Sequence, residues 1–184
     1  MSTGLTKKQI RSKILLRLKT HKEEDRERKS KIIKNKLFRT SSFKSAKILM
    51  FYLSFGGEVD TKEMIKAATK LGKIVVVPVC EHNRIIIKPS ILTHKARLEK
   101  GPHGVHEPAV KYIVNKNDLD LVIVPGLAFD KKGNRLGRGK GCYDYFLKQL
   151  PKKIPSIGLA YSFQILPGVP ATKDDVKVDK VIFA

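Results

Sequence analysis

A short stretch in the second half of the chain combines glycines with basic side chains. Every second position from 137 to 141 is glycine, and Arg135, Arg138 and Lys140 supply three positive charges. Glycine adopts backbone conformations closed to other residues, so successive amide N–H groups can turn toward one anion. The stretch therefore predicts a phosphate-binding loop. A flexible basic loop without a ligand is the other interpretation of this glycine spacing.

The loop matches neither of two common nucleotide-binding motifs. A Walker loop ends in Gly-Lys-Ser or Gly-Lys-Thr, whereas Lys140 is followed by Gly141 and Cys142, and the G-x-G-x-x-G fingerprint is also absent. The acidic residue Asp144 falls in the first turn of the helix expected next, where a carboxylate stabilises the positive end of the helix dipole. It could equally bind magnesium beside phosphates, and spacing alone does not decide between these roles.

The segments around this loop alternate between helical and strand patterns. Helices are expected over 7–18 with Thr6 as cap, 23–38 with Ile32, Ile33 and Leu37 buried, 61–71, and 142–150. Strands are expected over 47–53, 74–78, 85–87 closed by Pro89, 119–124, 157–161, and an edge strand over 176–183, with 100–108 as loop. The alternation predicts one α/β domain over residues 1–184. It has three layers, with a mostly parallel, Rossmann-like sheet and helices on both faces.

Composition narrows the class of protein. The chain has 184 residues and a formal net charge of +21, which favours anionic partners. Nucleic-acid binding is the main alternative from another class, but zinc fingers, RNA-binding aromatic motifs and basic low-complexity tails are missing from the sequence. No dedicated nucleic-acid partner is therefore expected. No apolar run reaches the length of a membrane span, so no membrane association is expected either.

The cysteines and histidines do not form a metal-binding pattern. Cys80 and Cys142 lie far apart and outside any CxxC pair, which fits a reducing cytoplasm. His103 and His106 lie near Glu107 without a third ligand at zinc-like spacing, so a loop beside the substrate is the favoured interpretation. Asp118 and Asp120 are expected to be solvated residues at a strand entrance.

Five segments, in order, resemble the 5-formyltetrahydrofolate cyclo-ligase family. They are Lys7-x-x-x-Arg11, Glu58-Val-Asp-Thr61, Gly104-Val-x-Glu-Pro108, the long stretch 125–144, and Asp175-Val-Lys-Val-Asp179. Two positions depart from the family's pattern. Cys142 stands where members usually have a second tyrosine, and Asp174 stands where many have histidine. A sugar-phosphate or acyl transferase on a similar fold is a further alternative, but it would not account for these matches.

The resemblance implies a role for each matched residue. The implied ATP-binding positions are Lys7, Lys8, Gln9, Ile10, Arg11, Arg135, Leu136, Gly137, Arg138, Gly139, Lys140, Gly141, Cys142 and Tyr143. Lys140 and Arg138 are the residues expected to act on the transferring phosphoryl group. Leu53 and Glu58 match positions of the reduced-folate pocket, and Asp144 and Asp175 match magnesium ligands.

The resemblance also implies the reaction. The family converts 5-formyltetrahydrofolate and ATP to 5,10-methenyltetrahydrofolate, ADP and phosphate, with Mg2+. ATP phosphorylates the formyl oxygen, nitrogen 10 attacks the activated carbon, and phosphate leaves. We expect this chain to act in the cytoplasm on 5-formyltetrahydrofolate, in its monoglutamate or polyglutamylated form.

Overall fold

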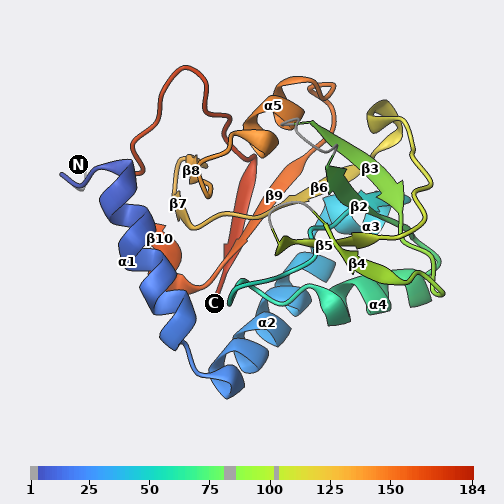
Figure 1. Ribbon diagram of the computed structural model, residues 1–184, viewed down its shortest axis with the longest axis horizontal. Coiled ribbons are helices and arrows are strands. Elements are labelled where there is room, and N and C mark those ends of the chain that lie inside the picture. The colour runs from blue at the N-terminus through green and yellow to red at the C-terminus, as the bar shows by residue number, and fades with distance from the viewer. Residues whose placement is uncertain (1–3, 81–85, 102–103) are drawn as a thin grey trace.

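The computed structural model describes residues 4–80, 86–101 and 104–184 (Figure 1). A six-stranded sheet forms its centre, and its strands lie in the order β11-β9-β6-β1-β2-β3. Their bounds are β1 Ile48–Met50, β2 Ile74–Cys80, β3 Ile87–Ile91, β6 Leu121–Val124, β9 Ser156–Ala160 and β11 Lys180–Phe183. All neighbouring pairs are parallel except β2 with β3, so the prediction of a mostly parallel sheet is confirmed.

The order of the parallel strands determines where a ligand can bind. In chain order, the five parallel strands lie as 2-1-3-4-5, the doubly wound arrangement of flavodoxin-like sheets. From β1 the chain builds outward first on one side and then on the other, so the order reverses between β1 and β6. In open α/β sheets, ligands bind beyond the carboxyl ends of the strands at this point.

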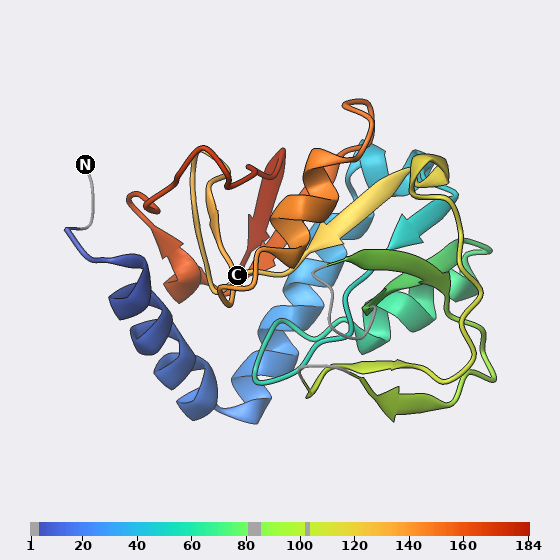
Figure 2. The ribbon, with the colours of Figure 1, turned by 45° about the horizontal axis from the view of Figure 1, so that its top comes forward.

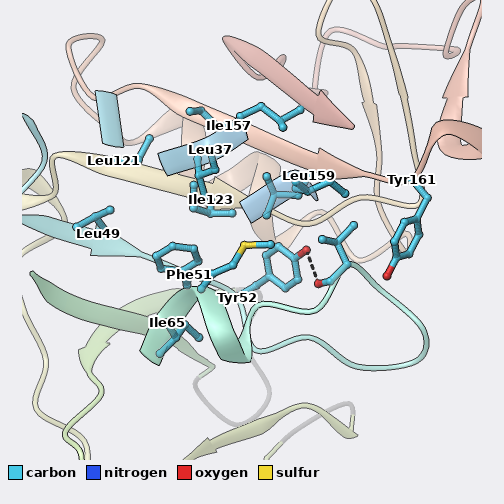
Figure 3. Packing of buried hydrophobic residues seen from close by; sticks show 14 of the residues in the cluster. Leu37, Leu49, Phe51, Tyr52, Ile65, Leu121, Ile123, Ile157, Leu159 and Tyr161 are labelled. Atoms are coloured by element: carbon cyan, nitrogen blue, oxygen red, sulfur yellow. Dashed lines mark hydrogen bonds between the residues drawn. The ribbon is translucent and has the colours of Figure 1, made fainter. Parts of the chain in front are cut away.

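Helices cover both faces of the sheet. The helices are α1 Lys7–Thr20, α2 Glu23–Phe38, α3 Ser41–Ser45, α4 Lys62–Lys70 and α5 Cys142–Lys148. Strand β6 is buried throughout, and its side chains alternate between two cores, which explains its continuous apolar sequence. Leu121 and Ile123 join the core under α1 to α4, part of which Figure 3 shows, and Val122 and Val124 join the core under α5. The predicted three-layer α/β class is therefore confirmed.

The first two helices mostly follow their sequence patterns. In α1 a capping box between Thr6 and Gln9 satisfies the first turn, as the expectation of Thr6 as cap required. In α2 the expected buried stripe is wrong at Ile32, which remains 37% exposed, because the buried face of the helix carries Ser30, Ile33 and Leu37.

Strand β1 covers only Ile48–Met50 of the strand expected over 47–53, and three further segments differ from their expected structure. Strand β3 continues through Pro89 because it is an edge strand, where proline is tolerated; Ile85, the expected first residue, lies outside the described residues. Part of the expected loop at 100–108 forms a hairpin of β4 (Leu98–Lys100) and β5 (His106–Pro108). Strand β11 begins only at Lys180, because the preceding backbone bonds to other segments.

The remaining elements are short. Strands β7 Ala128–Asp130, β8 Arg135–Leu136 and β10 Ile165–Leu166 form a small second sheet, and η2 Lys116–Asp118 and η3 Ser162–Gln164 are 3-10 turns. The β7–β8 hairpin leads directly into the glycine-rich stretch. Within the described residues, none of the helices is both long and apolar enough to cross a membrane.

Candidate functional site

A cavity of about 500 Å³ opens beyond the carboxyl ends of β1, β2 and β6. Its walls come from six parts of the chain that are distant in sequence. The lining residues are Lys7, Arg11, Tyr52, Leu53, Phe55, Glu58, Pro78, Cys80, Ile87, Val105, Glu107, Pro125–Leu127, Arg135–Asp144 and Asp175. The cavity therefore lies at the reversal point between β1 and β6, where the strand order predicts a ligand site.

The glycine-rich stretch forms a curved wall of this cavity. Gly139 and Gly141 have φ angles of 108° and 71°, which L-residues with side chains rarely adopt. Gly141 also caps the start of α5. Arg11 reaches from α1 and donates its Nε–H to the carbonyl of Gly137 at 3.0 Å. The first helix and the loop are thus joined at the cavity.

Arg135 is buried behind the loop. Its guanidinium pairs with Asp144 at 2.8 Å, and the Arg135 side chain is only 3% exposed. The same Asp144 oxygen accepts the backbone N–H of Val176 at 3.1 Å. Arg135 thereby fixes the start of α5 and the segment before β11, and it stands 5.8 Å from the ring centroid of Tyr143. Arg135 is also one of the residues that line the cavity.

Asp175, the second residue predicted to bind metal, lines the same cavity as Asp144. Its Oδ2 accepts hydrogen bonds from Lys7 at 2.5 Å and from the backbone and hydroxyl of Thr172. Partial burial acts to raise the pKa of Asp175, but the bonds from Lys7 and Thr172 outweigh it and lower that pKa. The carboxylate therefore stays ionised at neutral pH.

The donor set is compatible with magnesium bound together with a phosphate. Within the described ranges no group of three or more His, Cys, Asp or Glu side chains could hold a metal alone. Mg2+ in nucleotide sites, however, takes only one or two carboxylates and completes its shell with water and phosphate oxygens. Asp144 accepts its bonds on Oδ1 and Asp175 on Oδ2, so each retains a second carboxylate oxygen as a ligand.

Glu58 and Arg138 form an ion pair in the cavity wall. Arg138 donates to Glu58 Oε1 from Nη2 at 3.1 Å and from Nε at 3.3 Å, and it lies 4.1 Å from the ring centroid of Phe55. Burial raises the pKa of Glu58, and the nearby Arg138 charge only partly offsets this. A residue predicted for phosphate thus contacts a residue predicted for folate.

The cavity contains every predicted site residue except Lys8, Gln9 and Ile10. Ile10 is 1% exposed in the core beneath α1, and Gln9 completes the capping box. Lys8 is exposed on the helix surface. The matched segment at 7–11 contributes to the cavity through Lys7 and Arg11 alone, one helical turn apart.

Several lining residues were not named as site residues from the sequence, although Val105 and Glu107 lie in the matched segment 104–108. The missed side chains include Tyr52, Phe55, Pro78, Cys80, Ile87, Val105 and Glu107. Tyr52 is buried, and its hydroxyl donates to the carbonyl of Val59 at 3.0 Å (Figure 3). For Pro78 and Cys80 the signal that could have identified them is their position at the end of a predicted strand, and for Val105 and Glu107 it is the matched segment 104–108.

The two cysteines line the cavity as thiols. Burial, with the nearby Glu107 carboxylate, raises the pKa of Cys80 to about 11, and burial also raises the pKa of Cys142. Neither is a thiolate at neutral pH, which is the form that attacks as a nucleophile.

The other singled-out polar residues have structural surroundings. Asp120 is exposed and accepts the backbone N–H groups of Lys47 and Ile48 at 2.8 and 2.9 Å, which ties the start of β1 to β6. Asp118 is exposed in η2. His106 lies on β5, and His103 lies outside the described residues.

Comparison with known proteins identifies the family. The family model described as the 5-formyltetrahydrofolate cyclo-ligase family matches residues 4–184. A mouse 5-formyltetrahydrofolate cyclo-ligase is 32% identical over 100% of this chain and 96% of its own length. The enzyme of that name from Haemophilus influenzae is 33% identical over 76% of each chain.

Solved structures agree with these relatives. The NMR structure of Aquifex aeolicus 5,10-methenyltetrahydrofolate synthetase is 34% identical, with a TM-score of 0.84 over 97% of this chain and 90% of that one. The 5,10-methenyltetrahydrofolate synthetase from Mycoplasma pneumoniae is 25% identical, with a TM-score of 0.80 over 97% and 98% of the two chains. The fold, the cavity and nearly the whole sequence lead to one conclusion: this chain belongs to the 5-formyltetrahydrofolate cyclo-ligase family.

Proposed function

We propose that this chain converts 5-formyltetrahydrofolate to 5,10-methenyltetrahydrofolate with ATP, the reaction of its family. The observation that carries the proposal is the mixed lining of the cavity. A glycine-rich loop with Arg138, Lys140, Lys7 and Arg11 shares it with apolar side chains and the buried side chain of Glu58. Such a site can hold a polyanion beside a flat, polar ring system.

The reaction needs ATP because the formyl group is an amide. Its carbon is a poor electrophile and its oxygen is a poor leaving group. Transfer of the γ-phosphoryl group to that oxygen gives ADP and a phosphorylated formyl group. Nitrogen 10 of the substrate then attacks the activated carbon, the carbon–oxygen bond breaks, and phosphate departs as the ring closes. This chemistry needs no protein nucleophile, in agreement with the protonated Cys80 and Cys142.

The protein's part is positioning and charge stabilisation. Lys140, Arg138 and the loop amides bind the phosphates and stabilise the charge that spreads over the transferring group. Lys7 and Arg11 hold the nucleotide from α1. Glu58 and Leu53 hold the reduced pterin ring, and the bond from Arg138 to Glu58 keeps the two substrates in one alignment.

Asp144 and Asp175 are the residues that would hold Mg2+. Bound there with ATP, the ion would neutralise phosphate charge and orient the phosphate oxygens. The existing partners of these carboxylates suit this role, because Arg135 and Lys7 fix both side chains in the cavity wall. Lys7 would then lie next to both the carboxylate and the nucleotide.

The proposal also includes the domain organisation, the cellular location and the glutamylation state of the substrate. We treat residues 1–184 as one ATP- and folate-binding domain that acts in the cytoplasm on monoglutamate or polyglutamylated substrate. A dedicated nucleic-acid partner is not part of the proposal. The basic residues that the mechanism needs are confined to α1 and the loop.

An isotope experiment tests the phosphorylated intermediate. Substrate labelled with ¹⁸O in the formyl group is converted by the wild-type protein with Mg-ATP, and the released phosphate is analysed by mass spectrometry. The proposal predicts one labelled oxygen in each phosphate, because the formyl oxygen leaves with the phosphoryl group. Unlabelled phosphate, with the label in water, would rule out this route.

A further inference from the structure

The cavity contains a second buried carboxylate that the mechanism above does not use. Glu107 lies on β5, is 4% exposed and lines the same cavity as Glu58. A glutamate is rarely buried to this degree unless its charge has partners. Its neighbours therefore decide what it can do.

Specific contacts hold the Glu107 side chain in place. Its Oε1 accepts the backbone N–H of Cys80 at 2.8 Å, and its Oε2 pairs with Lys111 at 3.2 Å. The carboxyl group lies directly over Gly101, where a Cβ atom would stand 2.7 Å from the carboxyl carbon. A residue with a Cβ atom at position 101 would therefore displace the Glu107 carboxyl group. Each carboxylate oxygen has two lone pairs, so both can accept a further hydrogen bond from a ligand.

The side chains around Glu107 indicate which substrate this carboxylate faces. The basic lining residues belong to α1 and the 135–141 loop, whereas Cys80, Ile87 and Val105 line the cavity near Glu107. Figures 1 and 2 both show α1 and the β4–β5 hairpin on opposite sides of the molecule. A triphosphate would be repelled by an anionic side chain, so the hairpin side suits a neutral ring with N–H donors.

We infer that Glu107 accepts hydrogen bonds from the donor edge of the substrate's pterin ring, formed by its 2-amino group and N3–H. The inference rests on the proposed function, because it takes the substrate to be a reduced folate. Glu58 already accepts N–H bonds from Arg138 and Phe55. Glu107 is a second carboxylate, on another element, and makes the site specific for a 2-amino pterin.

The test measures binding with two ligands and two variants. Affinities of wild type, Glu107→Gln and Lys111→Met are measured by calorimetry for 5-formyltetrahydrofolate, for its 2-desamino analogue and for Mg-ATP. Glutamine keeps an acceptor for Cys80, and Lys111→Met removes the ion pair without changing a cavity residue. We expect Glu107→Gln to weaken folate binding roughly 10- to 100-fold, the scale of hydrogen bonds to a charged group. The affinity for the 2-desamino analogue should fall far less, and the affinity for Mg-ATP should change much less than the affinity for 5-formyltetrahydrofolate.

The outcomes separate this inference from the proposed function. Failure of the wild type to bind 5-formyltetrahydrofolate would overturn both. Wild-type binding with no effect of Glu107→Gln would overturn the inference alone. Equal losses for both folate ligands, matched by Lys111→Met, would make Glu107 a support for the hairpin and would also overturn it. Loss of Mg-ATP binding or of the thermal unfolding transition in Glu107→Gln would count against it in the same way.

Discussion

Lys140 lies between two glycines with positive φ, on backbone that can approach a phosphate closely. If it stabilises charge on the transferring phosphoryl group, Lys140→Ala should lower kcat by roughly 10²- to 10³-fold, the usual cost of losing one preorganised donor. Lys31→Ala, an exposed lysine on α2, is the matched control and should leave kcat unchanged. Steady-state kinetics with both variants decide this, and equal small losses in both would contradict the assignment.

Asp144 and Asp175 should both affect the magnesium requirement but differ in their effect on stability. Asp144→Asn and Asp175→Asn are each expected to raise the Mg2+ concentration needed for half-maximal turnover. Asp144→Asn should also destabilise the fold by about 1–3 kcal/mol, because it leaves the buried Arg135 without its charged partner. Asp175 and Lys7 are more exposed, so Asp175→Asn should cost less. Activity titrated at limiting Mg2+, together with urea unfolding, measures both effects. Wild-type turnover by either variant at limiting Mg2+ would exclude that residue as a ligand.

Glu58 should make stability depend on pH. Burial raises its pKa above the ordinary 4.5, so the folded protein holds this proton more tightly than the unfolded chain does. The stability that comes from this tighter proton binding is therefore fully present below pH 4.5, and it is lost as the pH rises through the pKa of Glu58 in the folded protein. Glu58→Gln removes this titration, so its unfolding free energy relative to wild type should increase with pH across this window and then level off. Urea unfolding from pH 4 upward tests this, and a difference independent of pH would refute it.

At the scale of elements, the close packing of α1 against the loop after β1 can be tested by replacing glycines with alanine. Gly57 has φ +84°, and a Cβ atom there would stand 2.5 Å from the carbonyl oxygen of Leu18 at the end of α1. Gly72 has a similar φ of +76°, but a Cβ atom there would meet only open space. Gly72→Ala should therefore cost about 1 kcal/mol for backbone conformation alone, whereas Gly57→Ala should cost roughly 1–3 kcal/mol more through the clash. Thermal and urea unfolding compare the two, and equal destabilisation would show that α1 does not pack against this loop as described.

Element patterns explain what the sequence could predict. The glycine-rich stretch and Asp144 were identifiable because their spacing is local, and buried strands such as β6 are identifiable from continuous apolar runs. Ile87 was not, because only the strand order β1-β2-β3 brings it to the cavity, and Glu107 was identifiable only as part of the matched segment 104–108, without a role. Ile10 illustrates the converse: it lies within a matched segment, yet its helix face points into the core.

At the scale of the whole molecule, the net charge of +21 exceeds what one nucleotide site requires. Among the residues that the structure describes, five basic residues line the cavity, namely Lys7, Arg11, Arg135, Arg138 and Lys140. Most of the basic residues therefore lie outside the cavity lining, and a generally basic surface attracts anions without specificity. The family assignment rests instead on the sequence and the fold of the entire chain.

The most direct measurement is turnover by the wild-type protein. Purified protein is mixed with 5-formyltetrahydrofolate and Mg-ATP, and methenyl product is followed by absorbance while ADP is counted. The account predicts product that requires nucleotide and divalent metal, with one ADP formed per methenyl group. Product formed at the same rate without nucleotide, or no product alongside tight and salt-sensitive binding of RNA or DNA, would contradict it.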